Sequence, residues 1–301
     1  MIATEPKKEL QRKISELRAL PAAPAILQPL LQMLRQPPDK IELKKVVQLV
    51  QMEKTITAQC LRVANSPLFG RVRPAESITA AVMTLGIQRM EDILLTSCFH
   101  QILQPNKWVT PPTDFWRHSL GCALVCKEFA ERIDYSDPDR GYLAGLLHDL
   151  GIIVNSVTYE REYAAVFAEA RNSGLPLDEV ERAKLGFTHS ESGGMLAKAW
   201  QMPELVVEAI EFHHDVGSSP RENPLVEMVH IVDLLCRMRG IGYGYEEWRA
   251  VELAADPAWE RLAKFCPRLG TMDLIRFTFD MDTYVERVKA TVDAVYRRGD
   301  A

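Results

Sequence analysis

The chain has 301 residues, 47% of them hydrophobic, which is enough apolar material for one large domain or two ordinary ones. Its 36 Lys and Arg residues are outnumbered by 41 Asp and Glu, and the formal net charge of −5 offers no general attraction for a polyanion such as DNA. No apolar run approaches the roughly 20 residues that span a bilayer, so we expect a cytoplasmic protein with neither a membrane nor a nucleic-acid partner.

The first third of the chain has apolar residues at spacings of three and four, the pattern of amphipathic helices, and alternating runs long enough for a strand are hard to find. The predicted fold class is therefore all-α. Two apolar stripes come first, at Leu27, Leu30, Leu31 and Leu34 and at Val46, Val47 and Val50. Further helices are predicted over residues 56–64, 78–85 and 90–103. We assign residues 1–104 to an N-terminal helical subdomain.

Residues 105–114 contain three prolines and separate this subdomain from a second helical region, residues 115–301, which includes a C-terminal extension. Its first helix is predicted over residues 115–133. An apolar helix then ends near Gly151, and a capping box from Thr188 to Glu191 opens a later one. A final amphipathic helix runs through Tyr284 and Val295.

Several of these helices bring a histidine or an aspartate to an apolar face or to a helix end. Asp233 is the most informative, because its helix PLVEMVHIVDLLCRM is apolar nearly all round. A carboxylate buried there would cost several kcal/mol unless it were paired or bound to a cation. The other residues of this kind are His118, His148, Asp149, His189, His213 and His214.

Imidazole and carboxylate groups together suit Fe, Mn, Zn or Ni, and these four remain unranked. Any one of these histidines alone is more often a core or surface group than a ligand, and the His-Asp dipeptide occurs twice, at residues 148–149 and 214–215. The ordered combination on separate helices is what favours a metal site. The six cysteines are expected to be buried and reduced; Cys122 and Cys126 share a helix face, but small core residues are a better interpretation than half of a soft-metal site.

The ordered series from His118 through His148-Asp149, His189 and His213-His214 to Asp233 resembles the ligand order of the HD superfamily of metal-dependent phosphohydrolases. There the first His, the His-Asp pair and the last Asp hold one metal, and the intervening histidines extend the site to a second. In the first half, ALPAAPAILQPLLQML, LRVANSPLFG and SITAAVMTLGIQRMEDILL resemble the HDOD family, a bacterial signalling relative. The resemblance covers roughly residues 15 to 235. It implies an N-terminal helical bundle followed by an HD-like domain, one or two divalent metal ions, and a regulatory role.

Two departures argue against ordinary hydrolysis. Active phosphodiesterases of the HD-GYP branch commonly read His-Asp-x-Gly-Lys, and the Lys position here is Ile152; the Gly-Tyr-Pro loop of that branch is replaced by DVGSSPREN. Ile152 can neither protonate a leaving group nor hold phosphate charge. Lys184 or Arg117 could substitute, although an ordinary solvated cation is the better interpretation of each.

We therefore expect a signalling protein with a metal-binding HD-type site and no robust hydrolase activity, and no catalytic residue is assigned. Its expected partner is a signalling protein or a small phosphorylated ligand. One alternative is a metal-dependent phosphohydrolase that acts on nucleotides or cyclic dinucleotides. Another is oxygen chemistry at a di-iron pair, which the HD fold is known to host.

Overall fold

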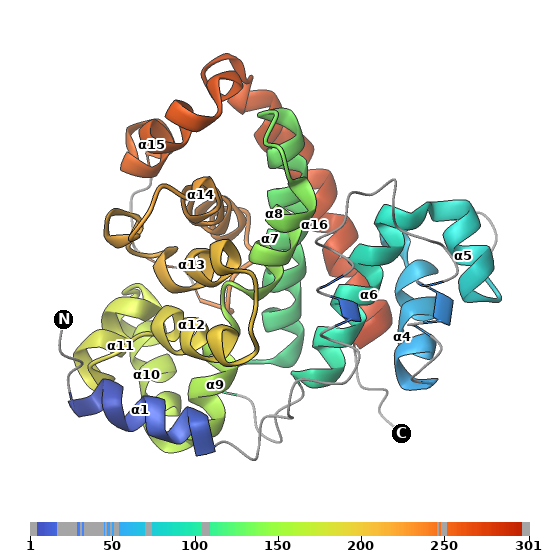
Figure 1. Cartoon of the computed structure of the whole chain (residues 1–301). Coiled ribbons are helices and arrows are strands. Elements are labelled where there is room, and N and C mark those ends of the chain that lie inside the picture. Colours follow the sequence, from blue (N-terminus) through green and yellow to red (C-terminus); the bar gives the residue numbers. More distant parts are fainter. Residues whose placement is uncertain are drawn as a thin grey trace. The chain divides into compact units, whose positions relative to one another are not determined.

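The computed structural model describes residues 5–16, 54–69, 74–103, 109–245, 247 and 252–296, together with residues 29, 30, 32, 45, 47, 48 and 50. All regular elements in this part of the chain are helical, so the all-α prediction is confirmed (Figure 1). Leu30 and Val50 from the two apolar stripes are helical and fully buried. Val47 is helical as well, and the remaining stripe residues Leu27, Leu31, Leu34 and Val46 lie outside the described residues.

The chain divides into two compact units, and each is built from two separate stretches. Unit 1 comprises Met1–Leu20 and Pro105–Asp282, and unit 2 comprises Pro21–Gln104 and Thr283–Ala301. The predicted subdomain of residues 1–104 and the predicted domain of residues 115–301 therefore need correction at both ends of the chain. At the N-terminal end the physical reason is helix α1 (Glu5–Glu16), whose apolar Leu10 and Ile14 are buried where it packs on helices of unit 1.

Unit 2 is formed by three described helices and the end of a fourth. They are α4 (Lys54–Ala64), α5 (Ile78–Leu85), α6 (Ile87–Ile102) and the last part of α16 (Leu274–Tyr296). The prediction for α5 has the correct bounds, whereas α4 and α6 each begin earlier than predicted. The C-terminal part of α16 joins this unit through the Thr291 hydroxyl, which accepts a hydrogen bond from the Leu68 amide at 3.1 Å.

Unit 1 contains α1 and nine further complete helices of the described chain. In order they are α7 (Pro112–Arg132), α8 (Pro138–Leu147), α9 (Leu150–Thr158), α10 (Glu160–Ser173), α11 (Leu177–Leu185), α12 (His189–Ala199), α13 (Glu204–Phe212), α14 (Pro224–Met238) and α15 (Pro257–Phe265). Helix α7 packs along α8 and against α14, while α12 packs on α9, α13 and α1 (Figure 1). Five of these helices, α7, α8, α12, α13 and α14, therefore surround a common interior.

Two glycines allow these helices to approach one another closely. A Cβ on Gly145 of α8 would lie 2.6 Å from the Cys122 carbonyl oxygen of α7, and one on Gly151 of α9 would lie 1.8 Å from the carbonyl oxygen of His189. The prediction that Gly151 ends a helix is wrong, because α8 ends at Leu147 and Gly151 lies inside α9. Glycine is required at position 151 because α9 packs closely against the backbone of His189.

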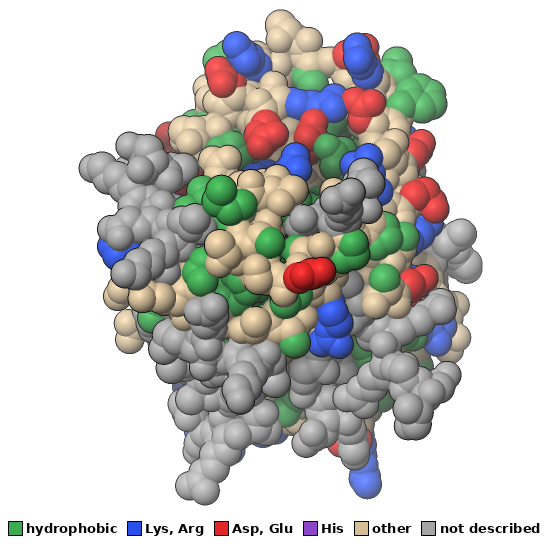
Figure 2. Space-filling model, turned by 90° about the vertical axis from the view of Figure 1, so that its right-hand side faces the viewer, with side chains coloured by type: hydrophobic (Ala, Val, Ile, Leu, Met, Phe, Trp, Pro, Cys, Tyr) green, Lys and Arg blue, Asp and Glu red, His purple; other side chains and the backbone are tan. Residues whose placement is uncertain are grey.

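The surface shows no large field of one charge on the face drawn in Figure 2. Basic and acidic side chains are interspersed there, and no histidine is visible among the described residues of that face. No helix in the described part of the chain combines the length and the apolar character needed to cross a bilayer.

Candidate metal centre

The structure brings all seven of the predicted site residues together in the interior of unit 1. His118 lies in the middle of α7 and Asp233 in the middle of α14, where the apolar surroundings expected from the sequence are present. Six of the seven side chains are essentially inaccessible to solvent and His214 is half-buried. The remaining site residues are His148, Asp149, His189, His213 and His214.

The positions of these five residues at helix ends bring their side chains to the site. His148 and Asp149 form the two-residue junction between α8 and α9, and both side chains are fully buried there. His189 is the first residue of α12 and lies within the predicted capping box, in which the Thr188 side chain and the Glu191 side chain each accept a hydrogen bond from the other's backbone amide. His213 and His214 follow the last residue of α13.

A first cluster forms around His118. Its Nε2 atom lies 3.0 Å from Asp233 Oδ1, 3.1 Å from His148 Nε2 and 3.2 Å from Asp149 Oδ2. His148 Nε2 lies 3.0 Å from the same Asp149 oxygen and 3.7 Å from Asp233 Oδ1. Four side chains from α7, α14 and the α8–α9 junction thus point their donor atoms at one small volume.

A second cluster uses the other oxygen of Asp149. Asp149 Oδ1 lies 3.0 Å from His189 Nε2 and 3.5 Å from His213 Nε2. His214 Nε2 completes the group at 3.1 Å from His189 Nε2. Asp149 therefore spans the two clusters, with one carboxylate oxygen facing each.

The far nitrogen of four of these imidazoles is held by an oxygen atom. Nδ1 lies 2.7 Å from the Ile241 carbonyl in His118, 2.8 Å from the Gly145 carbonyl in His148 and 2.8 Å from the Ile210 carbonyl in His213. In His189 it lies 2.7 Å from Glu181 Oε2. Carbonyl oxygens only accept, so Nδ1 is the protonated nitrogen and a neutral imidazole has its lone pair on Nε2.

These tautomers leave electron-pair donors facing one another with no hydrogen between them. Asp149 Oδ1 and His213 Nε2 are buried and make no hydrogen bond. Such an arrangement is repulsive unless a proton or a metal cation lies among the donors, so the residues fit a metal ion of the kind that takes nitrogen and oxygen ligands.

Without a metal, protons supply the positive charge between the facing donor atoms. Burial alone would lower the pKa of His118, but the Asp149 and Asp233 carboxylates outweigh it and raise the pKa to about 10. Burial likewise opposes ionisation of Asp149, yet the neighbouring His148 and His189 hold its pKa well below the usual range. The site is thus electrostatically set for bound positive charge.

Cys122 lies beside the first cluster, with its Sγ 3.7 Å from His118 Nε2, and it belongs to the group of side chains that could hold an ion. Cys126 does not belong to that group, so the structure does not bring the two cysteines together as a paired soft-metal site. All six cysteines are buried and free, as expected from the sequence.

Three side chains that sequence reasoning missed contact the clusters directly. Arg237 Nε donates to Asp233 Oδ1 at 2.8 Å, the Tyr243 hydroxyl donates to Asp149 Oδ2, and Glu181 accepts from both the ring and the backbone amide of His189. The four-residue spacing of Asp233 and Arg237 on one helix could have indicated Arg237. No local pattern marks Glu181 or Tyr243, because tertiary packing brings each to the site.

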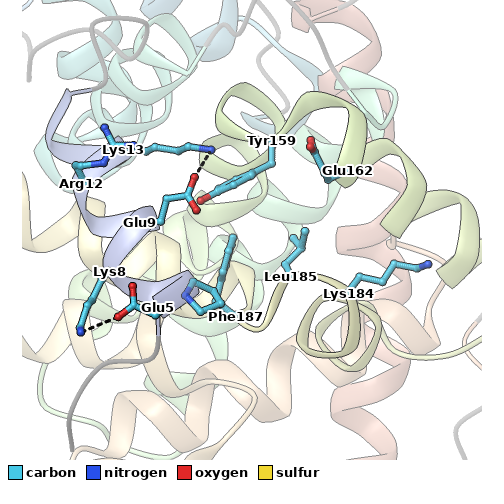
Figure 3. A pocket seen from close by; sticks show the side chains of 11 residues that line it. Glu5, Lys8, Glu9, Arg12, Lys13, Tyr159, Glu162, Lys184, Leu185 and Phe187 are labelled. Carbon is cyan, nitrogen blue, oxygen red and sulfur yellow. Dashed lines mark hydrogen bonds and ion pairs between the residues drawn. The ribbon is translucent and has the colours of Figure 1, made fainter.

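The two cations considered as substitutes for the missing lysine lie elsewhere. Lys184 pairs with Glu169 at 2.5 Å and lines a cavity of about 670 Å³ beside α1, where Figure 3 shows it apart from the α1 side chains. Arg117 bonds Asp114 at 3.3 Å within the first turns of α7. Ile152 itself is fully buried.

Comparison with known proteins places this geometry in context. The family model described as the HDOD domain matches residues 20–216. A crystal structure of an HDOD domain protein of unknown function from Geobacter sulfurreducens is 28% identical, with a TM-score of 0.83 over 96% of this chain and 98% of that one. A candidate phosphohydrolase from Shewanella amazonensis SB2B shares the fold at 22% identity, with a TM-score of 0.71 over 95% and 97% of the two chains.

A curated relative, an uncharacterised protein of Treponema pallidum (strain Nichols), is 23% identical over 209 residues. The match covers 69% of this chain and 40% of the relative. The chain thus spans less than half of the length of that relative.

Proposed function

The chain belongs to the HDOD domain family, and on this premise we propose that it is a bacterial regulatory protein whose HD-type clusters bind one or two divalent transition-metal ions, without robust hydrolase activity. The observation that carries the proposal is the set of Nε2 and carboxylate atoms that face one another while the Nδ1 atoms are held by oxygens. Oxygen partners of this kind orient metal-ligating histidines in proteins.

The proposed ligands are His118, His148, Asp149 and Asp233 for one ion and Asp149, His189, His213 and His214 for another. Imidazole with carboxylate favours Fe, Mn, Zn or Ni over Mg or Ca. A bound ion of this type would lower the pKa of a coordinated water and polarise an oxygen ligand. The chain's own contribution is to fix the positions of the ligands in a buried interior.

Lack of hydrolysis is proposed because the position that carries Lys in active relatives is the buried Ile152, while Lys184 and Arg117 are engaged elsewhere. The ligands themselves are buried, which limits the space for a substrate at the ions. The proposed partners are a signalling protein or a small phosphorylated ligand, and the proposed location is the cytoplasm.

A phosphohydrolase acting on nucleotides or cyclic dinucleotides is the second candidate, and Arg237 is the observation that favours it. This cation, whose side chain is 12% exposed beside Asp233, supplies a positive group at the site from a position other than 152. Turnover of a phosphodiester and nucleotide panel with added Mn or Fe, abolished in Asp149→Ala, would establish this candidate and overturn the proposed lack of hydrolysis.

Elemental analysis of protein purified without a histidine tag tests the metal proposal. We expect at least one transition-metal ion per chain in the wild type and a loss of it in Asp149→Ala. Asp215→Ala is the matched control, because Asp215 also follows a histidine but is exposed, and it should retain the metal. Metal-free wild-type protein whose stability is indifferent to chelators would contradict the proposal.

A further inference from the structure

A second feature of unit 1 lies directly behind the carboxylates of the clusters. The end of α14 and the glycine-rich segment that follows it line a cavity of about 660 Å³, a volume usual for a small-molecule site. Arg237, Arg239, Tyr243, Tyr245 and Glu247 contribute side chains to it, and none of the seven proposed metal ligands lines it. The cavity and the clusters are therefore separate spaces that share a wall.

Arg237 and Tyr243 form that wall. Both line the cavity, yet Arg237 Nε bonds Asp233 Oδ1 and the Tyr243 hydroxyl bonds Asp149 Oδ2. Asp233 Oδ1 is the oxygen that faces His118 Nε2 at 3.0 Å. A group that binds Arg237 from the cavity side therefore acts on a side chain that is hydrogen-bonded directly to the first cluster.

The hydrogen bonds of Arg237 are incomplete. Its Nε donates a hydrogen bond to Asp233 and its Nη1 donates one to Glu247. Its Nη2 is buried and has no hydrogen-bond partner in the described part of the chain. A guanidinium has five donors in a planar fork that matches phosphate and carboxylate oxygens, and leaving one of them buried and unpaired costs free energy.

The charges around the cavity favour an anionic occupant. Two guanidinium groups, Arg237 and Arg239, line it with the single carboxylate of Glu247, and Arg239 also pairs with Asp282 at 3.6 Å. The Tyr245 hydroxyl, 3.4 Å from Glu247, is a further donor that a ligand oxygen could take. Tetrahedral phosphate offers several acceptor oxygens, enough for the Arg237 donor now paired with Glu247 and for a neighbouring donor at once.

We propose that this cavity binds a small ligand through a phosphate group, anchored on Arg237 in competition with Glu247. Occupancy draws the guanidinium toward the cavity and leaves Asp233 Oδ1 more available to a metal ion. This coupling rests on the proposed metal function, whereas the anion site itself does not.

Calorimetric titration of the metal-free full chain with inorganic phosphate tests the site. Glu247→Gln removes the competing carboxylate and is expected to tighten phosphate binding by about fivefold, while Arg237→Gln weakens it by about tenfold or more. Arg221→Gln is the matched control, because Arg221 pairs with Glu204 on the surface away from the cavity, and its affinity should equal that of the wild type. Acetate should bind more weakly than phosphate.

The Glu247→Gln result decides the matter if Arg237→Gln fails to fold, since a misfolded protein does not gain affinity. Equal affinity of Glu247→Gln and the wild type, wild-type affinity in Arg237→Gln, acetate binding as tight as phosphate, or no phosphate binding at all would each overturn the site. In the coupling arm, Mn(II) affinity at saturating phosphate should rise by about threefold, and an unchanged value would overturn the coupling. Phosphate binding without any Mn(II) binding would instead refute the proposed metal function and leave the anion site intact.

Discussion

Residues beside the clusters hold the side chains of the proposed ligands in position. Gly151 allows α9 to lie against the backbone of His189, and Glu181 holds the ring of that histidine while also accepting hydrogen bonds from Tyr163 at 2.6 Å and Asn155 at 3.3 Å. His230 supports the neighbouring ligand, since its Nδ1 lies 2.6 Å from the carbonyl oxygen of His213. Gly151, Glu181 and His230 are not themselves proposed metal ligands.

Gly151→Ala should be strongly destabilising. The new methyl group would lie 1.8 Å from the His189 carbonyl oxygen, and backbone cannot move aside as a flexible side chain can. We expect a loss of about 3 kcal/mol or more of the free energy of unfolding, measured by urea denaturation, together with a loss of bound metal. Gly217→Ala, where a Cβ would meet nothing within 4 Å, should change stability by less than about 0.5 kcal/mol. Equal stability of the two variants would disprove the packing argument.

Glu181→Gln should affect the second cluster selectively. The amide is a weaker acceptor for His189 Nδ1 and can present a donor to it, so the ring loses its fixed orientation. Binding of Mn(II) at this cluster, followed by electron paramagnetic resonance during titration, should weaken by about 10- to 100-fold. Glu179→Gln, an exposed change on the same helix, should leave the titration unchanged. The prediction fails if both variants titrate alike.

At the scale of elements, helix ends carry most of the site. His148 and Asp149 occupy a helix junction, His189 opens α12, and His213 closes α13, whereas His118 and Asp233 need buried helix interiors. Helix ends are where a side chain can be set by capping rather than by a continuous face. The position of α12 therefore determines the position of His189.

Thr188→Ala removes the N-cap of α12 and should cost about 1 kcal/mol of stability, measured by thermal unfolding. Ser77→Ala removes the N-cap of α5 in unit 2 and should cost a similar amount. Only the first change should also weaken metal binding, because fraying of α12 releases His189 from Glu181. Equal metal affinity in the two variants would show that the cap does not position the histidine.

The sequence predicted most helices and the seven side chains that come together, and the reason is physical. Apolar spacing predicted α5 with its observed bounds, and polar residues on apolar faces pointed to all seven side chains that the structure brings together. Gly151 was misinterpreted because glycine has two common uses, at helix ends and at close contacts, which local sequence does not distinguish. Tyr243 and Glu181 gave no signal because long-range packing alone brings them to Asp149 and His189.

At the scale of the whole molecule, the clusters lie within unit 1, and metal binding should stabilise the two units unequally. Removal of metal by a chelator removes the stabilisation that binding gives to the folded unit, so amide hydrogen exchange should accelerate in α7, α8, α12, α13 and α14. Exchange in α4, α5 and α6 of unit 2 should change little, and these helices serve as the internal control. Uniform acceleration along the chain would contradict a site confined to unit 1.

The position of helix α1 also affects the order in which unit 1 can fold during translation. This helix leaves the ribosome before α9 and α12, which cover its apolar Leu10 and Ile14 and are made only after all of α4 to α8. Helix α1 therefore cannot dock during translation until the chain has extended past residue 199, and its apolar face lacks these partners until then. Cutting the chain between residues 104 and 105 would leave unit 1 without this helix, and the exposed faces of α9 and α12 would favour aggregation.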